Sequence, residues 1–117
     1  MITTQETTVR CSPAGPRASK FQVLLAAQKL TTDVSSKPFI HFPIYGTSTL
    51  MEWSSGSATF QLYVGGGGNS YDIISTDSLL LAVDEIFYKC IVNSTVQNAD
   101  LGQLGVRKAA SIRLQAH

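Results

Sequence analysis

The pattern of hydrophobic and polar positions predicts a chain built mainly of short β-strands. Residues 58–64 alternate polar and apolar side chains, as a strand with one exposed face does. Residues 38–45 are expected to be extended, because each of their prolines removes a ladder hydrogen-bond donor and favours a sheet edge. The strand pattern resumes at 49–53 after a Gly-Thr-Ser break at 46–48, which predicts a hairpin.

Other segments have less decisive patterns. Residues 21–27 fit a strand buried on both faces or a short helix, and the neighbouring segments favour the strand. Residues 7–11 predict a first strand, and the Pro/Gly-rich residues 12–16 predict a turn after it. Within the ambiguous run 79–92, residues 85–92 are rich in aromatic and β-branched side chains and favour a strand.

The pattern at the C-terminus differs, and it predicts the only helix, at about 98–113. Leu101, Leu104, Lys108 and Ile112 recur at the three- and four-residue steps of one helical face. A second face consists of small residues, which let another backbone approach closely. This face packs either on the protein's own sheet or against a second copy, and it comprises Gly102, Gly105, Val106, Ala109 and Ala110.

The same stretch resembles the C-terminus of the coronavirus non-structural protein 9 family. Residues 109–115, Ala-Ala-Ser-Ile-Arg-Leu-Gln, are similar to the tail of that family without a gap. Gly102 falls on the first glycine of the family's Gly-x-x-x-Gly dimer seam and Val106 on the second, with Gly105 one residue early. The resemblance implies a divergent nidovirus protein that is mainly β: a small antiparallel OB-like barrel of six or seven strands, closed by one C-terminal helix and paired through it as a homodimer.

A protease site follows the predicted helix. Leu114-Gln115-Ala116 has the form that the coronavirus main protease cuts between Gln and a small residue. We therefore expect a single domain over residues 1–115. Residues 116–117 are interpreted as a tag remnant or as the start of the next cleavage product.

The resemblance also implies weak, sequence-independent binding of single-stranded RNA within a viral replication complex in the host cytoplasm, with the polymerase and other replicase subunits as partners. Bases would stack on aromatic faces beside a cationic groove. Scattered surface charge with core aromatics is the competing interpretation. Arg113 matches the family tail, and the full set of candidates is Arg10, Lys89, Arg107, Lys108, Arg113, Trp53, Tyr63 and Tyr71.

Composition narrows these expectations. The chain has 117 residues and a formal net charge of +1, so any RNA site must come from local clustering of cations.

Cys11 and Cys90 lack metal-ligand spacing, and buried free thiols in a reducing compartment are favoured over a bridge. Residues 93–95, Asn-Ser-Thr, match a glycosylation sequon, but without a visible secretion signal we interpret them as a turn. No apolar run is long enough to span a membrane.

Nothing in the sequence predicts an enzyme, a metal site or a cofactor. The glycines at 65–68 are not followed by Lys-Ser/Thr, so they predict a hairpin tip and not a phosphate loop. His41 is interpreted as a packed or edge residue, and Asp72, Asp84 and Glu85 have no pattern that orders them as acid and base. The alternative functions are a small viral coat subunit and a β-barrel that binds a small ligand.

Overall fold

The computed structural model describes residues 9–44, 48–65 and 70–117. Parts of three predicted features lie outside these residues: the start of the first strand, most of the break at 46–48 and most of the glycine tip.

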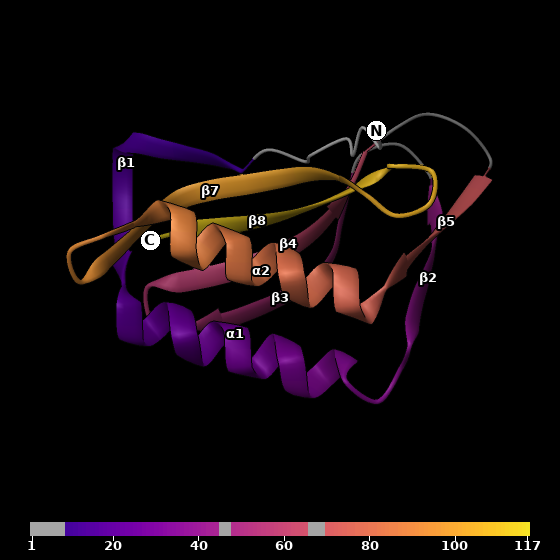
Figure 1. The fold of residues 1–117 in the computed structure, drawn as a ribbon, viewed down its shortest axis with the longest axis horizontal. Coiled ribbons are helices and arrows are strands. Elements are labelled where there is room, and N and C mark those ends of the chain that lie inside the picture. The colour runs from indigo at the N-terminus through magenta and orange to yellow at the C-terminus, as the bar shows by residue number, and fades with distance from the viewer. Residues whose placement is uncertain (1–8, 45–47, 66–69) are drawn as a thin grey trace, which may run out of the picture.

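The described residues form two antiparallel sheets and two helices (Figure 1). The main sheet has the order β1 (Arg10–Ser19), β7 (Thr95–Leu104), β8 (Ala110–Ala116), β4 (Ala58–Val64) and β3 (Ser48–Ser55), and β6 (Ile91–Val92) also pairs with β7. The second sheet is a ribbon of β2 (Phe39–Ile44) and β5 (Ser70–Ser75). The helices are α1 (Lys20–Val34) and α2 (Thr76–Cys90).

Both helices cover one face of the main sheet and leave the other face open (Figure 1). On the helix side, Phe60 and Leu62 of β4 lie opposite Leu114 and Ile112 of β8, and all four are fully buried. Burying one such side chain stabilises the fold by about 1.5–3 kcal/mol relative to leaving it exposed. The intervening residues point to the open face and are partly exposed, which gives these strands their two-residue period.

The expected fold class is therefore confirmed at the coarse level: the protein is mainly β and its sheets are antiparallel. Strands β1 and β3 lie at the two ends of the main sheet, and no pairing between them closes it within the described part of the chain. The predicted hairpin of 38–45 with 49–53 is wrong, because β2 pairs with β5 and β3 pairs with β4.

Residues 21–27 belong to helix α1, so the strand favoured there is wrong. The Ser19 side chain caps the helix by accepting a hydrogen bond from the Gln22 N–H at 3.2 Å. The buried residues Val23, Ala26 and Leu30 then recur at helical spacing against the sheet. The helical alternative was the correct one for this segment.

Residues 85–92 were also expected to form a strand, but most of them belong to α2. The hydroxyl of Ser75 caps this helix by accepting a hydrogen bond from the Ser78 N–H at 3.1 Å. Buried Leu79, Val83 and Ile86 follow the helical period. Only Ile91 and Val92 form a strand, the short β6.

The helix predicted at 98–113 is absent, and this is the largest correction. These residues form the second half of β7, a loop and the first half of β8. Gln103, Gly105 and Lys108 have φ angles of 60°, 95° and 60°, which a right-handed helix does not allow. From Ala110 onward burial alternates with a period of two. The predicted homodimer through this helix therefore has no structural basis, since its five interface residues lie on two strands and a loop.

Cys11 and Cys90 form a disulfide, so the expectation of two free thiols is wrong. The bond links β1 to the last residue of α2 across a sequence separation of 79, and the two Cα atoms are 5.5 Å apart. Cys90 is fully buried. The sequence positions of the two cysteines gave no sign of this pairing, because only the tertiary fold brings residues 11 and 90 together.

The last residues of the chain are part of the main sheet. Ala116 pairs with Ala58, and the His117 ring nitrogen Nε2 lies 2.8 Å from the Thr59 hydroxyl. Leu114 and Gln115 lie within the same paired strand. The residues interpreted as a tag remnant thus contribute to the fold, while cleavage after Gln115 stays a prediction.

Candidate functional site

A row of polar side chains crosses the open face of the main sheet. Strand register places Arg10 of β1 beside Asp100 of β7, Asp100 beside Arg113 of β8, Arg113 beside Gln61 of β4, and Gln61 beside Glu52 of β3. Arg10 Nε lies 3.3 Å from Asp100 Oδ1, and Gln61 Nε2 donates to Glu52 Oε1 at 2.9 Å. Such cross-strand pairs stabilise a sheet by about 0.2–1 kcal/mol each. The row as a whole carries two positive and two negative charges.

Arg113 also contacts the aromatic ring of Tyr63. The two residues lie on neighbouring strands, and the Arg113 Cζ atom is 4.6 Å from the Tyr63 ring centroid. This distance is within the range of a cation–π contact, which holds the guanidinium plane over the sheet. A planar group of this kind is a surface on which a nucleic-acid base can stack.

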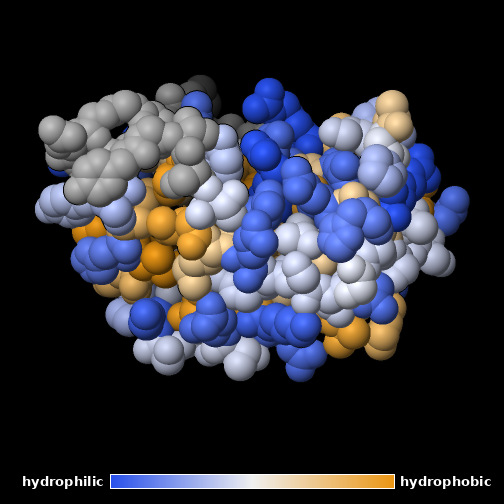
Figure 2. Space-filling view, turned by 180° about the vertical axis from the view of Figure 1, so that it is seen from behind, coloured by the Kyte–Doolittle hydropathy of each residue, from blue (hydrophilic) through white to orange (hydrophobic). Residues whose placement is uncertain are grey.

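A shallow hollow of about 260 Å³ lies around this pair. It brings together four of the residues nominated for RNA contact: Arg10, Tyr63, Lys108 and Arg113. Asp100 and Gln103 contribute further polar atoms to its wall. Seen from behind the helices, the centre of the surface is mainly hydrophilic (Figure 2).

The other nominated residues lie elsewhere. Tyr71 of β5 is exposed, and Arg107 lies over its ring at 5.9 Å from the centroid. Lys89 lies on α2, on the helix-covered side, and pairs with Glu85 at 3.1 Å. Trp53 is only 6% exposed. Its burial removes it from the residues on which a base could stack.

Asp72 positions the loop that carries Lys108, a role that the sequence interpretation missed. Its carboxylate is 1% exposed. Oδ1 accepts the N–H groups of Ile73 and Arg107, each at 2.8 Å, and Oδ2 accepts the N–H of Ala109 at 3.1 Å. A carboxylate between Tyr71 and the apolar pair Ile73-Ile74 was the only sequence signal for this role, because a buried charge needs partners. The strand that contains Asp72 thereby anchors the β7–β8 loop.

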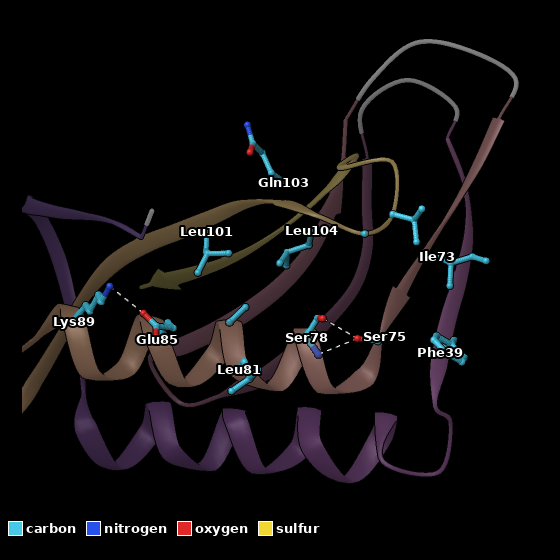
Figure 3. Close-up of a pocket in the computed structure, with 13 residues that line it drawn as sticks. Phe39, Ile73, Ser75, Ser78, Leu81, Glu85, Lys89, Leu101, Gln103 and Leu104 are labelled. Carbon is cyan, nitrogen blue, oxygen red and sulfur yellow. Dashed lines mark hydrogen bonds and ion pairs between the residues drawn. The ribbon is translucent and has the colours of Figure 1, made fainter. Parts of the chain in front are cut away.

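A larger hollow of about 630 Å³ lies between α2, the β2–β5 ribbon and the end of β7 (Figure 3). Phe39, Leu81 and Val106 contribute apolar surface and are 52%, 65% and 80% exposed. Its polar lining includes the Glu85–Lys89 ion pair at the end of the hollow away from Phe39 (Figure 3). None of the residues nominated for RNA contact except Lys89 lies in this hollow.

The described residues contain no group of three or more His, Cys, Asp or Glu side chains placed to hold a metal ion. The disulfide occupies both thiols, so neither cysteine is a free nucleophile. His41 is exposed in the ribbon opposite Ile73. Within the described segments, no helix has the length and apolar character needed to cross a membrane.

Comparison of the chain with protein-family models, curated proteins and solved structures gave no match. The resemblance to the coronavirus non-structural protein 9 family thus rests on the sequence alone, and the tail that matches without a gap, residues 109–115, lies almost entirely in strand β8 in this structure.

Proposed function

We propose that this protein is a non-enzymatic module that binds single-stranded RNA weakly, and without sequence preference, on the open face of its main sheet. The observation that carries the proposal is the meeting of Arg10, Lys108 and Arg113 with Tyr63 around one hollow. The four residues come from β1, the β7–β8 loop, β8 and β4, so the fold gathers them from distant parts of the chain.

The arrangement suits the chemistry of single-strand binding. Proteins of this type combine a cationic surface that follows the phosphates with planar groups on which bases stack. An antiparallel sheet with helices on only one side offers such a surface, because its free face accommodates splayed bases. Here the guanidinium of Arg113, held over Tyr63, supplies the planar group.

Charge balance limits the affinity. Asp100 pairs with Arg10, and Glu52 lies at the end of the same row. These carboxylates repel phosphates and offset part of the attraction from the cations. We therefore expect dissociation constants between about 1 and 100 µM at moderate salt, in the range of non-specific nucleic-acid binding.

The test is fluorescence anisotropy with a labelled single-stranded RNA of about twenty nucleotides, titrated at several salt concentrations. Arg113→Gln should weaken binding about 5- to 100-fold, because it removes both a phosphate contact and the stacking plane. It should also reduce the slope of log affinity against log salt by about 0.7, the value for one phosphate contact on a single strand. Unchanged binding by this variant would contradict the proposed site.

Two matched variants sharpen the result. Lys89→Gln removes one positive charge on the helix-covered side and should leave RNA affinity unchanged. Asp100→Asn removes a negative charge from the open face and should strengthen binding, while the loss of its exposed pair with Arg10 costs only about 0–1 kcal/mol of stability. If RNA affinity depended on net charge alone, Arg113→Gln and Lys89→Gln would weaken binding equally, and Asp100→Asn would strengthen it. Weaker binding by Lys89→Gln would therefore contradict a site confined to the open face.

The viral setting has less support than RNA contact itself. The replicase subunits and polymerase as partners, and the host cytoplasm as the location, stay predictions of the sequence resemblance. Light scattering, measured beside the anisotropy titration, distinguishes the coat-protein alternative, because it detects large closed assemblies. The titration itself distinguishes the ligand-binding alternative, because such a module shows no salt-dependent RNA affinity.

A further inference from the structure

The disulfide bears on where this chain folds. Disulfides form and persist in oxidising environments such as the secretory lumen and the cell exterior, and they are rare in the cytosol. The Cys11–Cys90 bond joins the first described strand to α2, and the Cys90 end is fully buried in the core. It is therefore a structural bond, which indicates that the chain folds where thiols are oxidised.

A glycosylation sequon lies shortly after Cys90. Asn69, Asn93 and Asn98 are the asparagines of the chain, and of these only Asn93 is followed by any residue except proline and then by Ser or Thr. This segment was interpreted as a turn from the sequence, and the structure confirms the turn, between β6 and β7. The turn and the sequon are compatible, since acceptor sites of this kind lie in surface loops of secreted proteins.

The geometry of the turn leaves the acceptor side chain accessible. Asn93 and Ser94 are exposed, and Asn93 has a φ of 56°, a conformation that asparagine tolerates better than most residues. The turn is held by the Thr95 hydroxyl, which donates to the Val92 carbonyl, and by the Lys20 N–H, which donates to the Ser94 carbonyl, both at 2.9 Å. Within the described residues, no hydrogen bond uses the Asn93 side-chain amide.

The turn lies apart from the β2–β5 ribbon and from both hollows described above. It lies at the end of the sheet beside the start of α1, and the β2–β5 ribbon lies at the opposite end (Figure 1). Neither hollow described above is lined by residues of this turn. A large polar group on Asn93 would extend into solvent without displacing any described contact.

We propose that Asn93 is an N-glycosylation site, modified by an oligosaccharyltransferase from a lipid-pyrophosphate-linked oligosaccharide donor. The side-chain amide nitrogen of Asn93 attacks the anomeric carbon of the first sugar and forms a C–N bond. The C–O bond to the pyrophosphate breaks, its electron pair leaves with the lipid pyrophosphate, and the amide nitrogen gives up one proton. No oxidant or reductant takes part. The proposal does not require RNA binding, but it requires an oxidising compartment and therefore excludes the host cytoplasm that the sequence resemblance predicts as the location.

The experiment expresses the full chain, preceded by a cleavable secretion leader, in a eukaryotic cell and analyses the intact mass with and without reduction. The disulfide is an internal marker that the chain reached an oxidising lumen. The expected product is disulfide-bonded and carries a hexose-containing mass that peptide N-glycosidase removes, leaving an aspartate at the modified position. Asn93→Gln and Thr95→Ala should each lose the entire added mass. Thr95→Ser and the matched control Asn98→Gln should keep it.

Three results would overturn the proposal. The first is a disulfide-bonded wild-type chain without any glycan, and the second is a glycan that persists on Asn93→Gln. Recovery of the chain only with reduced cysteines would also overturn it, because the inference begins from folding in an oxidising compartment.

Discussion

The carboxylate of Asp72 accepts the main-chain N–H of Arg107 at 2.8 Å, across 35 residues of sequence. Through this bond and the one from Ala109, a strand of the small ribbon fixes the loop between two strands of the main sheet. The loop carries Lys108 to the candidate RNA surface. The stability of this contact therefore affects both the fold and the proposed function.

Replacing Asp72 with asparagine should lower the free energy of unfolding by about 1–3 kcal/mol. Both carboxylate oxygens accept backbone N–H groups, whereas an amide has one oxygen and would turn an NH₂ group toward a donor. Urea denaturation followed by circular dichroism measures the change. Asp84→Asn, on the exposed face of α2, is the matched control and should stay within about 0.5 kcal/mol of the wild type. Equal stability of the two variants would contradict the role of Asp72.

The two glycines nominated for a dimer seam should respond differently to substitution by alanine. Gly105 has a φ of 95°, and a Cβ there would lie 2.5 Å from Asp72 Oδ2, so Gly105→Ala should be strongly destabilising. The unfavourable backbone conformation alone costs about 1–2 kcal/mol. At Gly102 an added Cβ would meet nothing within 4 Å, and Gly102→Ala should be nearly neutral. Thermal unfolding of both variants tests this contrast, and a helical dimer seam would instead make both substitutions disruptive.

Removal of the disulfide in the double variant Cys11→Ser/Cys90→Ser should destabilise the protein substantially. The bond closes a loop across a sequence separation of 79. The chain-entropy model gives about 4.5 kcal/mol for a loop of this size. Chemical denaturation of the wild type with and without reductant measures the effect, and reductant should not change the double variant. If reductant left the wild type unaffected, the bond would not contribute to stability in solution.

Trp53 should report on folding and not on RNA. Its indole Nε1 donates to Asp33 Oδ2 at 3.0 Å, and it is the only tryptophan of the chain. Trp53→Phe should cost about 1–3 kcal/mol, from the lost hydrogen bond and the reduced packing volume, while RNA affinity stays unchanged. Tryptophan emission of the wild type should likewise be unaffected by RNA. Quenching of this emission on titration would place the RNA site near Trp53.

Local pattern accounts for part of the fold. The clean alternation of 58–64 predicted β4, and the proline-containing extended segment predicted β2. A short helix at 21–27 was an open alternative in the sequence, and the structure shows it as part of α1, with Ser19 as its cap and buried positions at helical spacing. It was missed because the same short apolar run also fits a buried strand, and periodicity alone does not separate the two.

The C-terminal stretch shows why pattern failed elsewhere. Leu101, Leu104 and Ile112 have helical spacing, yet the same residues are also buried on one face of a strand–loop–strand unit. The backbone turn between them is stabilised by Asp72, a residue far away in sequence, and by the positive φ of Gly105. Helix propensity is a weak local preference, and such tertiary contacts override it.

The candidate RNA surface divides in the same way. The sequence supplied the residue types, and Arg10, Tyr63, Lys108 and Arg113 were all nominated for charge or aromatic character. Only the strand order β1-β7-β8-β4 brings them to one face, while Lys89 goes to the helix side and Trp53 to the core.

By itself the sequence determined a mainly β chain and which residues carry charge or an aromatic ring, since alternation and side-chain chemistry are local properties. The tertiary structure decided the helices, the disulfide and the residues that meet, because pairing between distant strands depends on contacts that no local window contains.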